Sequence, residues 1–191
     1  MSCTVAVMTA PQSSDLLMDN LFLARGDRTA IRHVRYSDME EFVRLSAAST
    51  TLHDPWIYSP RSAGQFQEYL KRFDGPNSLC LLICDTNSES IVGFATVSGI
   101  IRNPYHRGVL GYGAFAASTG KGYMTEGLQL VINHCFAVLN LHRLEADIQP
   151  ENRRSIALAR RVRMRREAFS PKFILINDVW CDHERWVIIN D

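Results

Sequence analysis

The sequence predicts an α+β domain in which about four helices cover a mostly antiparallel sheet of about six to seven strands. Apolar runs of strand length alternate with longer segments of helical periodicity from residue 29 onward. Short polar turns join several of the strand-like runs, which is typical of antiparallel pairs. The chain has 191 residues, 46% of them hydrophobic, which suits one domain with a core of its own.

Strands are predicted where apolar and β-branched residues cluster between turn-forming residues. Polar residues 85–90 and the pair Asn177 and Asp178 are the turns of two predicted hairpins. In chain order the predicted strands are residues 29–36, 79–84, 91–101, 108–116, 143–148, 167–176 and 182–189.

Helices are predicted from capping residues and from apolar periodicity. Ser37 and Asp38 begin the first helix, with Glu40 and Glu41 favourably placed in its first turn. In the third helix, apolar residues recur at spacings of three and four, which predicts one buried face. That face consists of Met124, Leu128, Val131, Cys135 and Val138. In chain order the predicted helices are residues 37–49, 62–73, 121–140 and 153–162.

Residues 1–28 are predicted to be an N-terminal extension of a domain that spans residues 29–191. Residues 15–24 are a candidate short amphipathic helix within this extension. The start of the chain lacks the basic and apolar regions of a signal peptide. No apolar run approaches the roughly 20 residues that span a bilayer. We therefore expect a cytoplasmic protein without a membrane partner.

Charge and cysteine content exclude several classes of protein. The net charge of +1 creates no global field that would demand nucleic acid or a membrane. Of the five cysteines, Cys80 and Cys84 lie inside an apolar run. We expect them to be buried reduced thiols rather than a disulfide or a metal site, as in a reducing cytoplasm. None of the six histidines has the spacing of a metal site, so we expect no metal.

The most informative segment is residues 116–123, which follow a predicted strand and open a helix. Gly120 and Gly122 allow a tight turn that leaves backbone N–H groups open to a ligand. The first N–H groups of a helix have no internal partner, and the helix dipole adds positive charge, so this arrangement suits a pyrophosphate. Lys121 would add a point charge or be solvated. On these residues alone, a simple strand-to-helix turn explains the glycines equally well.

The context of these glycines resembles a known family. Residues 120–128 (GKGYMTEGL) closely resemble the coenzyme A-binding motif of the GNAT superfamily of N-acetyltransferases. Residues 142–146 (HRLEA) and 150–155 (PENRRS) are similar to the RimJ/RimL branch, which includes ribosomal-protein N-terminal acetyltransferases. The order of strands and helices from residue 29 to residue 189 also fits a GNAT-like fold. The resemblance implies acetyl-CoA as co-substrate and a primary amine as acceptor.

The resemblance also assigns roles to individual residues. The backbone of Phe115, Ala116 and Ala117 would hold the pantetheine arm. The amides of Gly120, Gly122 and Tyr123 would hold the pyrophosphate, with Lys121 beside them. Asn152 would contact the pantetheine or the acetyl end, and Ser155 would lie near the thioester sulfur.

Three positions depart from the family pattern. Ala117 stands where the family usually has Gln or Arg, and Arg163 and Ala168 stand where glycine is common. Arg163 would occupy a left-handed backbone position at the end of a helix, at a cost of roughly 1 kcal/mol for a residue other than glycine.

Acetyl transfer requires a neutral amine and a protonated leaving thiol. Glu145 is the candidate base; the alternative is an ion pair with Arg153 or Arg154. Ser155 is the candidate acid for the thiolate, or a serine that contacts only backbone. An α-amine, with a pKa of about 7.7–8.0, needs a weaker base than lysine, with about 10.4. Asn152 also suits the N-cap of the last helix.

The acceptor site is expected beside the loop of residues 53–56. Trp56 and Tyr58 are candidate walls of an acceptor pocket, although Trp56 suits core packing as well. Tyr112 and residues 180–183 are further candidates. Seven arginines between residues 153 and 166 form a cluster without an acid. They would contact a phosphate of coenzyme A, face an RNA, or form a solvated surface.

Together these observations predict an acetyltransferase that moves an acetyl group from acetyl-CoA to the α-amine of a protein or peptide N-terminus. A small-molecule amine as acceptor and a non-catalytic acyl-CoA-binding protein are the alternatives. We expect no specific nucleic acid partner. Proximity to the ribosome, and a monomer or a homodimer, stay open.

Overall fold

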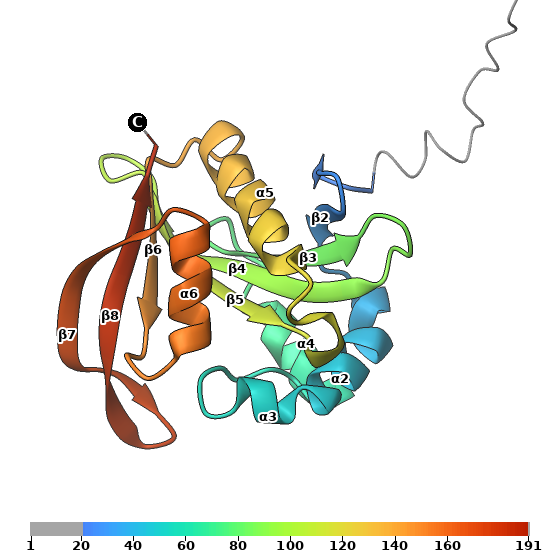
Figure 1. The fold of residues 1–191 in the computed structure, drawn as a ribbon. Coiled ribbons are helices and arrows are strands. Elements are labelled where there is room, and N and C mark those ends of the chain that lie inside the picture. The colour runs from blue at the N-terminus through green and yellow to red at the C-terminus, as the bar shows by residue number, and fades with distance from the viewer. Residues whose placement is uncertain (1–20, 191) are drawn as a thin grey trace, which may run out of the picture.

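The structure, a computed structural model, describes residues 21–190 and confirms the α+β fold. Eight strands in this part of the chain form one sheet. They are β1 (Ala24–Arg25), β2 (Thr29–His33), β3 (Leu79–Asp85), β4 (Ile91–Ile101), β5 (Arg107–Ala114), β6 (Arg143–Ile148), β7 (Arg165–Ile176) and β8 (Val179–Ile189). The order across the sheet is β1-β2-β3-β4-β5-β6-β8-β7 (Figure 1). Every neighbouring pair is antiparallel except β5 and β6, which are parallel.

Helices pack on both faces of this sheet. Those within residues 21–190 are α2 (Met39–Ala48), α3 (Thr50–His53), α4 (Ala63–Lys71), α5 (Tyr123–Ala137) and α6 (Arg153–Arg161). One core cluster joins α5 and α6 to the sheet through side chains such as Leu128, Ala159 and Leu144. A second cluster joins α2 and α4 to the opposite face around Phe42 and Phe66. Among residues 21–190, no helix combines the length and the hydrophobicity that a transmembrane helix requires.

The predicted elements agree with the structure apart from some of their ends. The helix expected over residues 37–49 begins after a 3-10 turn at Tyr36–Asp38, and a break at Ser49 separates α2 from α3. Glu40 and Glu41 lie in the first turn of α2, as predicted. The side chain of Asp38 does not cap α2, because it accepts hydrogen bonds from Arg32 and from the Arg35 backbone instead.

The buried face of α5 is confirmed for four of its five predicted residues. Met124, Leu128, Val131 and Cys135 are buried, but 67% of Val138 is exposed. The prediction for Val138 was wrong because the helix ends at Ala137, so the periodicity stops before its side chain can reach the sheet.

Two further expectations have a structural outcome. Cys80 and Cys84 are free and buried, and burial raises the pKa of their thiols to about 12 and about 11. Both thiols therefore stay protonated. The helix expected over residues 15–24 lies mostly outside the described residues, and Ala24 belongs to β1. The division into an extension (residues 1–28) and a domain (residues 29–191) stays a prediction.

Candidate active site

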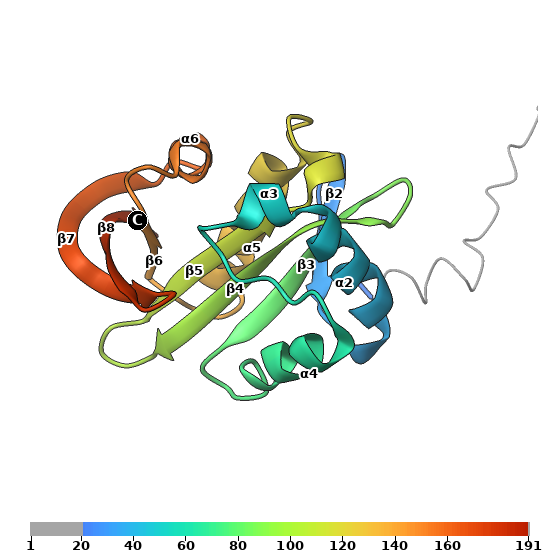
Figure 2. The ribbon, with the colours of Figure 1, turned by 90° about the horizontal axis from the view of Figure 1, so that it is seen from below.

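The two parallel strands at the centre of the sheet diverge. β5 and β6 pair only through residues 107–109 and 143–145. β5 continues to Ala114 along β4 without another strand on its β6 side among residues 21–190. Figure 2 shows the strands spreading apart, with α6 beside the opening. Across it, the hydroxyl of Tyr112 on β5 donates to the carbonyl of Ser155 on α6 at 2.9 Å.

A glycine loop joins the open end of β5 to α5. Gly120 and Gly122 have φ angles of 75° and 85°, which residues other than glycine rarely adopt. The backbone N–H groups of residues 120–124 have no acceptor within the described part of the chain. A side chain at Gly120 would meet no atom within 4 Å, so this side of the loop is open. Unpaired donors at the N-terminus of a 15-residue helix suit the pyrophosphate of acetyl-CoA.

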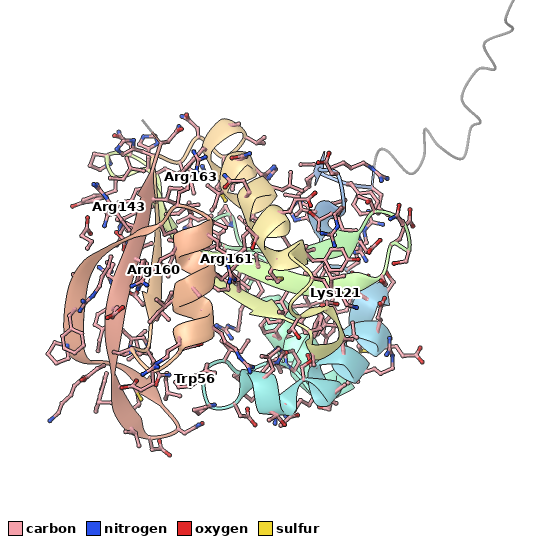
Figure 3. The ribbon with its side chains drawn as sticks, viewed as in Figure 1. Trp56, Lys121, Arg143, Arg160, Arg161 and Arg163 are labelled. Atoms are coloured by element: carbon pink, nitrogen blue, oxygen red, sulfur yellow. The ribbon has the colours of Figure 1, made fainter. Side chains whose placement is uncertain are left out.

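Neighbouring side chains fix the shape of this loop. Lys121 lies in this loop (Figure 3). Its ammonium donates to the Ala117 carbonyl at 3.0 Å, which closes the loop on itself. The Arg28 guanidinium donates to the Lys121 carbonyl at 2.9 Å and lies 4.7 Å from the centre of the Tyr123 ring. Glu126 on α5 in turn accepts the backbone N–H of Arg28 at 2.8 Å. Neither Arg28 nor Glu126 could be predicted from the sequence, because the two residues are far apart along the chain.

The end of β5 is held by residues from α3 and its N-cap. His53 is 2% exposed and its Nε2–H donates to the Ala114 carbonyl at 2.8 Å. Burial lowers the pKa of His53. The Ala116 N–H donates to the Ser49 hydroxyl at 2.9 Å.

The three residues predicted to hold the pantetheine arm differ in whether their backbone N–H groups are free to bind a ligand. The Phe115 N–H donates to the Val92 carbonyl at 3.1 Å, and the Ala116 N–H is taken by Ser49. Only the N–H of Ala117, among these three, has no acceptor within residues 21–190. Their pantetheine role stays a prediction.

The N-terminus of α6 presents two of the predicted residues. Asn152 is the N-cap, and its side-chain oxygen accepts the Ser155 N–H at 3.2 Å, which confirms the capping role. The Ser155 side chain is half-buried, and its hydroxyl has no hydrogen-bond partner in the described part of the chain. This hydroxyl is free to donate to a ligand in the opening.

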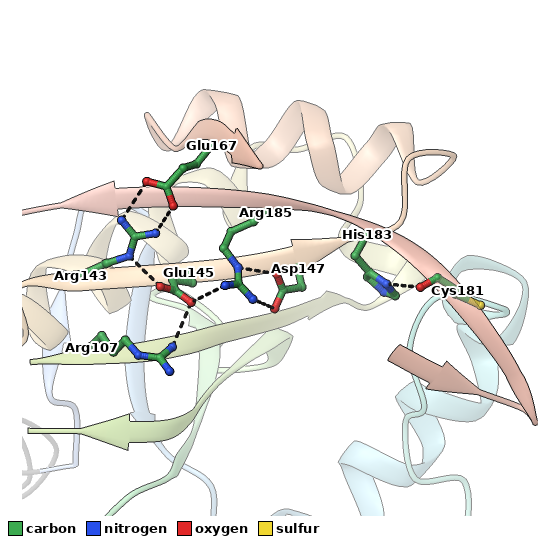
Figure 4. A network of polar contacts seen from close by, with 8 residues as sticks. All are labelled: Arg107, Arg143, Glu145, Asp147, Glu167, Cys181, His183 and Arg185. Atoms are coloured by element: carbon green, nitrogen blue, oxygen red, sulfur yellow. Dashed lines mark hydrogen bonds and ion pairs between the residues drawn. The ribbon is translucent and has the colours of Figure 1, made fainter. Parts of the chain in front are cut away.

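Glu145, the candidate base, lies in a network of ion pairs (Figure 4). Its carboxylate, 5% exposed, lies 2.7 Å from Arg143, 3.0 Å from Arg107 and 3.6 Å from Arg185. These are not the arginines that the sequence suggested as partners. Arg143 also pairs with Glu167, and Arg185 pairs with Asp147 at 2.9 Å. The network joins β5, β6, β7 and β8 where β5 and β6 still pair.

A cleft of about 940 Å³ lies on the other side of the opening. Trp56, Tyr58 and Tyr112 all line it, so the structure brings the three predicted acceptor residues together. Trp56 is half-buried and belongs to neither core cluster. Glu145 does not line the cleft. Burial raises the pKa of Tyr112, which keeps its hydroxyl protonated.

Other residues that line the cleft were not predicted from the sequence. The tip of the β7–β8 hairpin contributes residues 174–177, whereas Trp180, on the neighbouring strand, does not line the cleft. Helix α4 and the residues after it contribute Tyr69, Arg72 and Phe73. Such residues carry no local motif, because only the fold brings α4 and the hairpin to the same cleft.

The arginine cluster is exposed along α6 and the start of β7 (Figure 3). Arg160 lies 5.3 Å from the centre of the Trp186 ring, and Arg166 pairs with Glu184 at 3.1 Å. Arg163 has a φ of 67°, which confirms the predicted left-handed position. Ala168 has no positive φ.

Comparison with known proteins gives relatives over most of the chain. Residues 28–165 match the family described as acetyltransferase (GNAT) domain. The probable N-acetyltransferase YjcK of Bacillus subtilis is 26% identical over 176 residues, which cover 88% of this chain and 97% of that protein. The [ribosomal protein uS5]-alanine N-acetyltransferase of Escherichia coli is 32% identical over 99 residues, 52% of this chain and 51% of that protein.

Solved structures share the fold. Mycobacterium smegmatis RimJ in complex with CoA-disulfide has a TM-score of 0.78 at 23% identity, over 84% of this chain and 81% of that one. A mutant of the spermidine N-acetyltransferase SpeG of Vibrio cholerae has a TM-score of 0.70 at 16% identity, over 86% and 95%. At these identities the likeness concerns the fold and leaves the acceptor open.

Proposed function

Since the chain belongs to the acetyltransferase (GNAT) domain family, we propose that it acetylates the α-amine of a protein or peptide N-terminus. The chain is an acetyl-CoA-dependent N-acetyltransferase, and the proposal concerns its acceptor and its mechanism. In this mechanism the amine attacks directly in a ternary complex of enzyme, acetyl-CoA and acceptor.

The charge of the cleft carries the proposal. Its charged lining residues within the described chain are Asp54, Arg61 and Arg72. Asp54 is already paired with Arg61. A polyamine bears several positive charges, and the cleft offers it no free carboxylate. The remaining walls are mostly aromatic and apolar, which suits the backbone and side chains of a peptide.

The glycine loop and α6 would hold the co-substrate. When bound, acetyl-CoA supplies the acetyl group as a thioester. The unpaired amides of Gly120, Gly122 and Tyr123 would bind its diphosphate, and Asn152 and Ser155 would face its reactive end. The Ser155 hydroxyl would donate a hydrogen bond to the departing sulfur.

The amine chemistry fits an α-amine. Its nitrogen bonds to the acetyl carbon, the carbon–sulfur bond breaks, the amine gives its proton to water, and the thiolate takes one from water. Because an α-amine has a pKa of about 7.7–8.0, a usable fraction is neutral near pH 7 without a strong base. The base role of Glu145 stays a prediction. Its three arginine partners favour a structural role, and it is not among the residues that line the cleft.

Relatives support an N-terminal acceptor. The E. coli protein that shares half of this chain is named for acetylating an alanine of ribosomal protein uS5. The SpeG structures, named for spermidine, share the fold at lower identity. The E. coli protein, which has the higher sequence identity, therefore favours a peptide acceptor.

The test is a release assay for free thiol with acetyl-CoA and a panel of acceptors. The panel contains peptides with a free α-amine, the same peptides with a blocked α-amine and an internal lysine, and spermidine. We expect thiol release only with the free α-amine, and an acetyl group on the first residue by mass spectrometry. Turnover of spermidine without turnover of any peptide would overturn the proposal. Calorimetric binding of acetyl-CoA without any turnover would instead indicate a non-catalytic protein.

A further inference from the structure

The guanidinium of Arg72 is the one cation of the cleft without a carboxylate partner among residues 21–190. Arg72 follows α4, and its guanidinium lies 5.7 Å from the centre of the Tyr69 ring and 5.8 Å from that of Phe73. The two rings hold the side chain at the cleft wall. Tyr69 is 6% exposed, so this support is part of the core.

The nearby acids are occupied or out of reach. Glu68 lies one turn before Arg72 on α4, but its carboxylate lies 2.6 Å from the Lys71 ammonium. Asp54 pairs with Arg61. Asp74 is exposed and makes no ion pair with Arg72 in the described structure. The donors of the Arg72 guanidinium are therefore free for a ligand.

The shape of the surface gives a ligand a path past Arg72. A second hollow of about 390 Å³ shares Tyr58, Gln65, Tyr69 and Arg72 with the cleft. Arg72 thus lies where the cleft continues over α4. Tyr112, beside the opening between β5 and β6, lines the same cleft, so one acceptor peptide could extend from the opening toward Arg72.

We propose that Arg72 selects acceptor peptides that carry a carboxylate within their first few residues. The planar fork of an arginine matches the two oxygens of an Asp or Glu side chain. The inference deepens the proposed function and rests on it, because the amine of the same peptide must reach the thioester. An unpaired guanidinium also repels a polyamine. Arg72 alone would therefore favour acidic peptides and disfavour polyamines.

The experiment compares peptides that share a free N-terminal alanine and differ only in one residue. Glu is placed in turn at positions two to five, and Gln at the same position is its neutral match. We expect kcat/KM to favour Glu over Gln by about fivefold at one or two of these positions, which is typical of one exposed charge pair. The preference should shrink in high salt, because the pair is exposed.

Variants assign the preference to Arg72. In Arg72→Gln the ratio of Glu to Gln peptides should fall to about one, while Arg72→Lys should keep part of it. Arg44→Gln is the matched control, because Arg44 is exposed on α2 and does not line the cleft. Equal rates for Glu and Gln peptides, or an unchanged ratio in Arg72→Gln, would overturn the inference and leave the proposed function standing. Failure to acetylate any peptide would overturn both.

Discussion

Arg163 shows how a single residue can carry strain that the surrounding helix end imposes. Its φ of 67° lies in the left-handed region. The Met164 N–H donates to the Ala159 carbonyl at 3.0 Å, a hydrogen bond that requires a left-handed residue between them. The helix end therefore has the geometry for which most proteins use glycine, with an arginine in that place.

The substitution Arg163→Gly should stabilise the protein by about 1 kcal/mol, because glycine adopts this φ without a steric penalty. The free energy of unfolding in urea measures the effect. Arg161→Gly is the control: Arg161 is exposed in the last turn of the same helix, where glycine should destabilise. A loss of stability in Arg163→Gly would show that the arginine side chain contributes more than its backbone strain costs.

At the scale of elements, the strand β5, the glycine loop and α5 act as one unit. His53 and Ser49 hold the end of β5, and Arg28 and Lys121 hold the loop. These contacts position the unpaired amides before a ligand arrives. Binding then needs little reorganisation.

Gly120→Ala should weaken the binding of acetyl-CoA. A Cβ at Gly120 meets no neighbour, so the cost comes from the φ of 75° alone. The free loop of the variant can relax away from this conformation, and binding must restore it, which raises the Kd by roughly tenfold. Isothermal calorimetry measures the Kd.

Gly75→Ala is the matched control, because its Cβ also meets no atom within 4 Å and its φ is not positive. We expect an unchanged Kd there. An equal Kd in wild type and Gly120→Ala would mean that the loop amides do not bind the diphosphate.

Local patterns were sufficient to predict most elements and the tight turn of the glycine loop. Strands β4 and β6 have the predicted ends, since apolar runs and turn residues mark them in the sequence. The glycines of the loop and the N-cap Asn152 are also local signals. Strand β1, of two residues, has no such signal and forms only by pairing with β2.

The cleft that we propose for the acceptor could be predicted only in part. Trp56 and Tyr58 were proposed because they lie in or beside the loop that the resemblance places near the acceptor, and Tyr112 was a further candidate. All three line the cleft. Arg72 and residues 174–177 were not, because nothing in their local sequence indicates that α4 and the hairpin face the same cleft. The partners of Glu145 likewise come from three strands.

At the scale of the whole molecule, β5 and β6 are hydrogen-bonded at one end, the closed end, and separate at the other, the open end. The Glu145 network ties four strands together at the closed end. The glycine loop, α6 and the cleft surround the open end. These ion pairs hold β5 and β6 together where the two strands are hydrogen-bonded, and the strands separate beyond residues 109 and 145.

Glu145→Gln should lower the free energy of unfolding by roughly 2 kcal/mol, because it removes a buried carboxylate that pairs with three partly exposed arginines. Urea unfolding measures the loss. Glu167→Gln, whose carboxylate is 41% exposed, should cost less. The pH dependence of kcat/KM should keep its shape in Glu145→Gln. A stable variant with a much lower kcat/KM and without the acidic limb of this profile would instead assign Glu145 as the base.

Two buried histidines should make the stability of the whole protein depend on pH. His53 and His134 are 2% and 9% exposed, and burial lowers the pKa of both in the folded state. In the unfolded chain a histidine binds a proton below about pH 6.5, whereas the folded protein must keep these two neutral until a lower pH. The unfolded state therefore binds more protons, and stability falls as the pH drops from about 7 toward 5.5.

Urea unfolding at pH 7.5, 6.5 and 5.5 measures this slope. His53→Gln keeps a donor for the Ala114 carbonyl and removes one titrating group, so its slope between pH 6.5 and 5.5 should be shallower than that of the wild type. Carboxylates with a lowered pKa, such as Glu167, add their own loss of stability only at more acidic pH. A wild-type stability that stays constant from pH 7.5 to 5.5 would mean that the two rings accept protons without unfolding, which their burial in the core around α3 and α5 argues against.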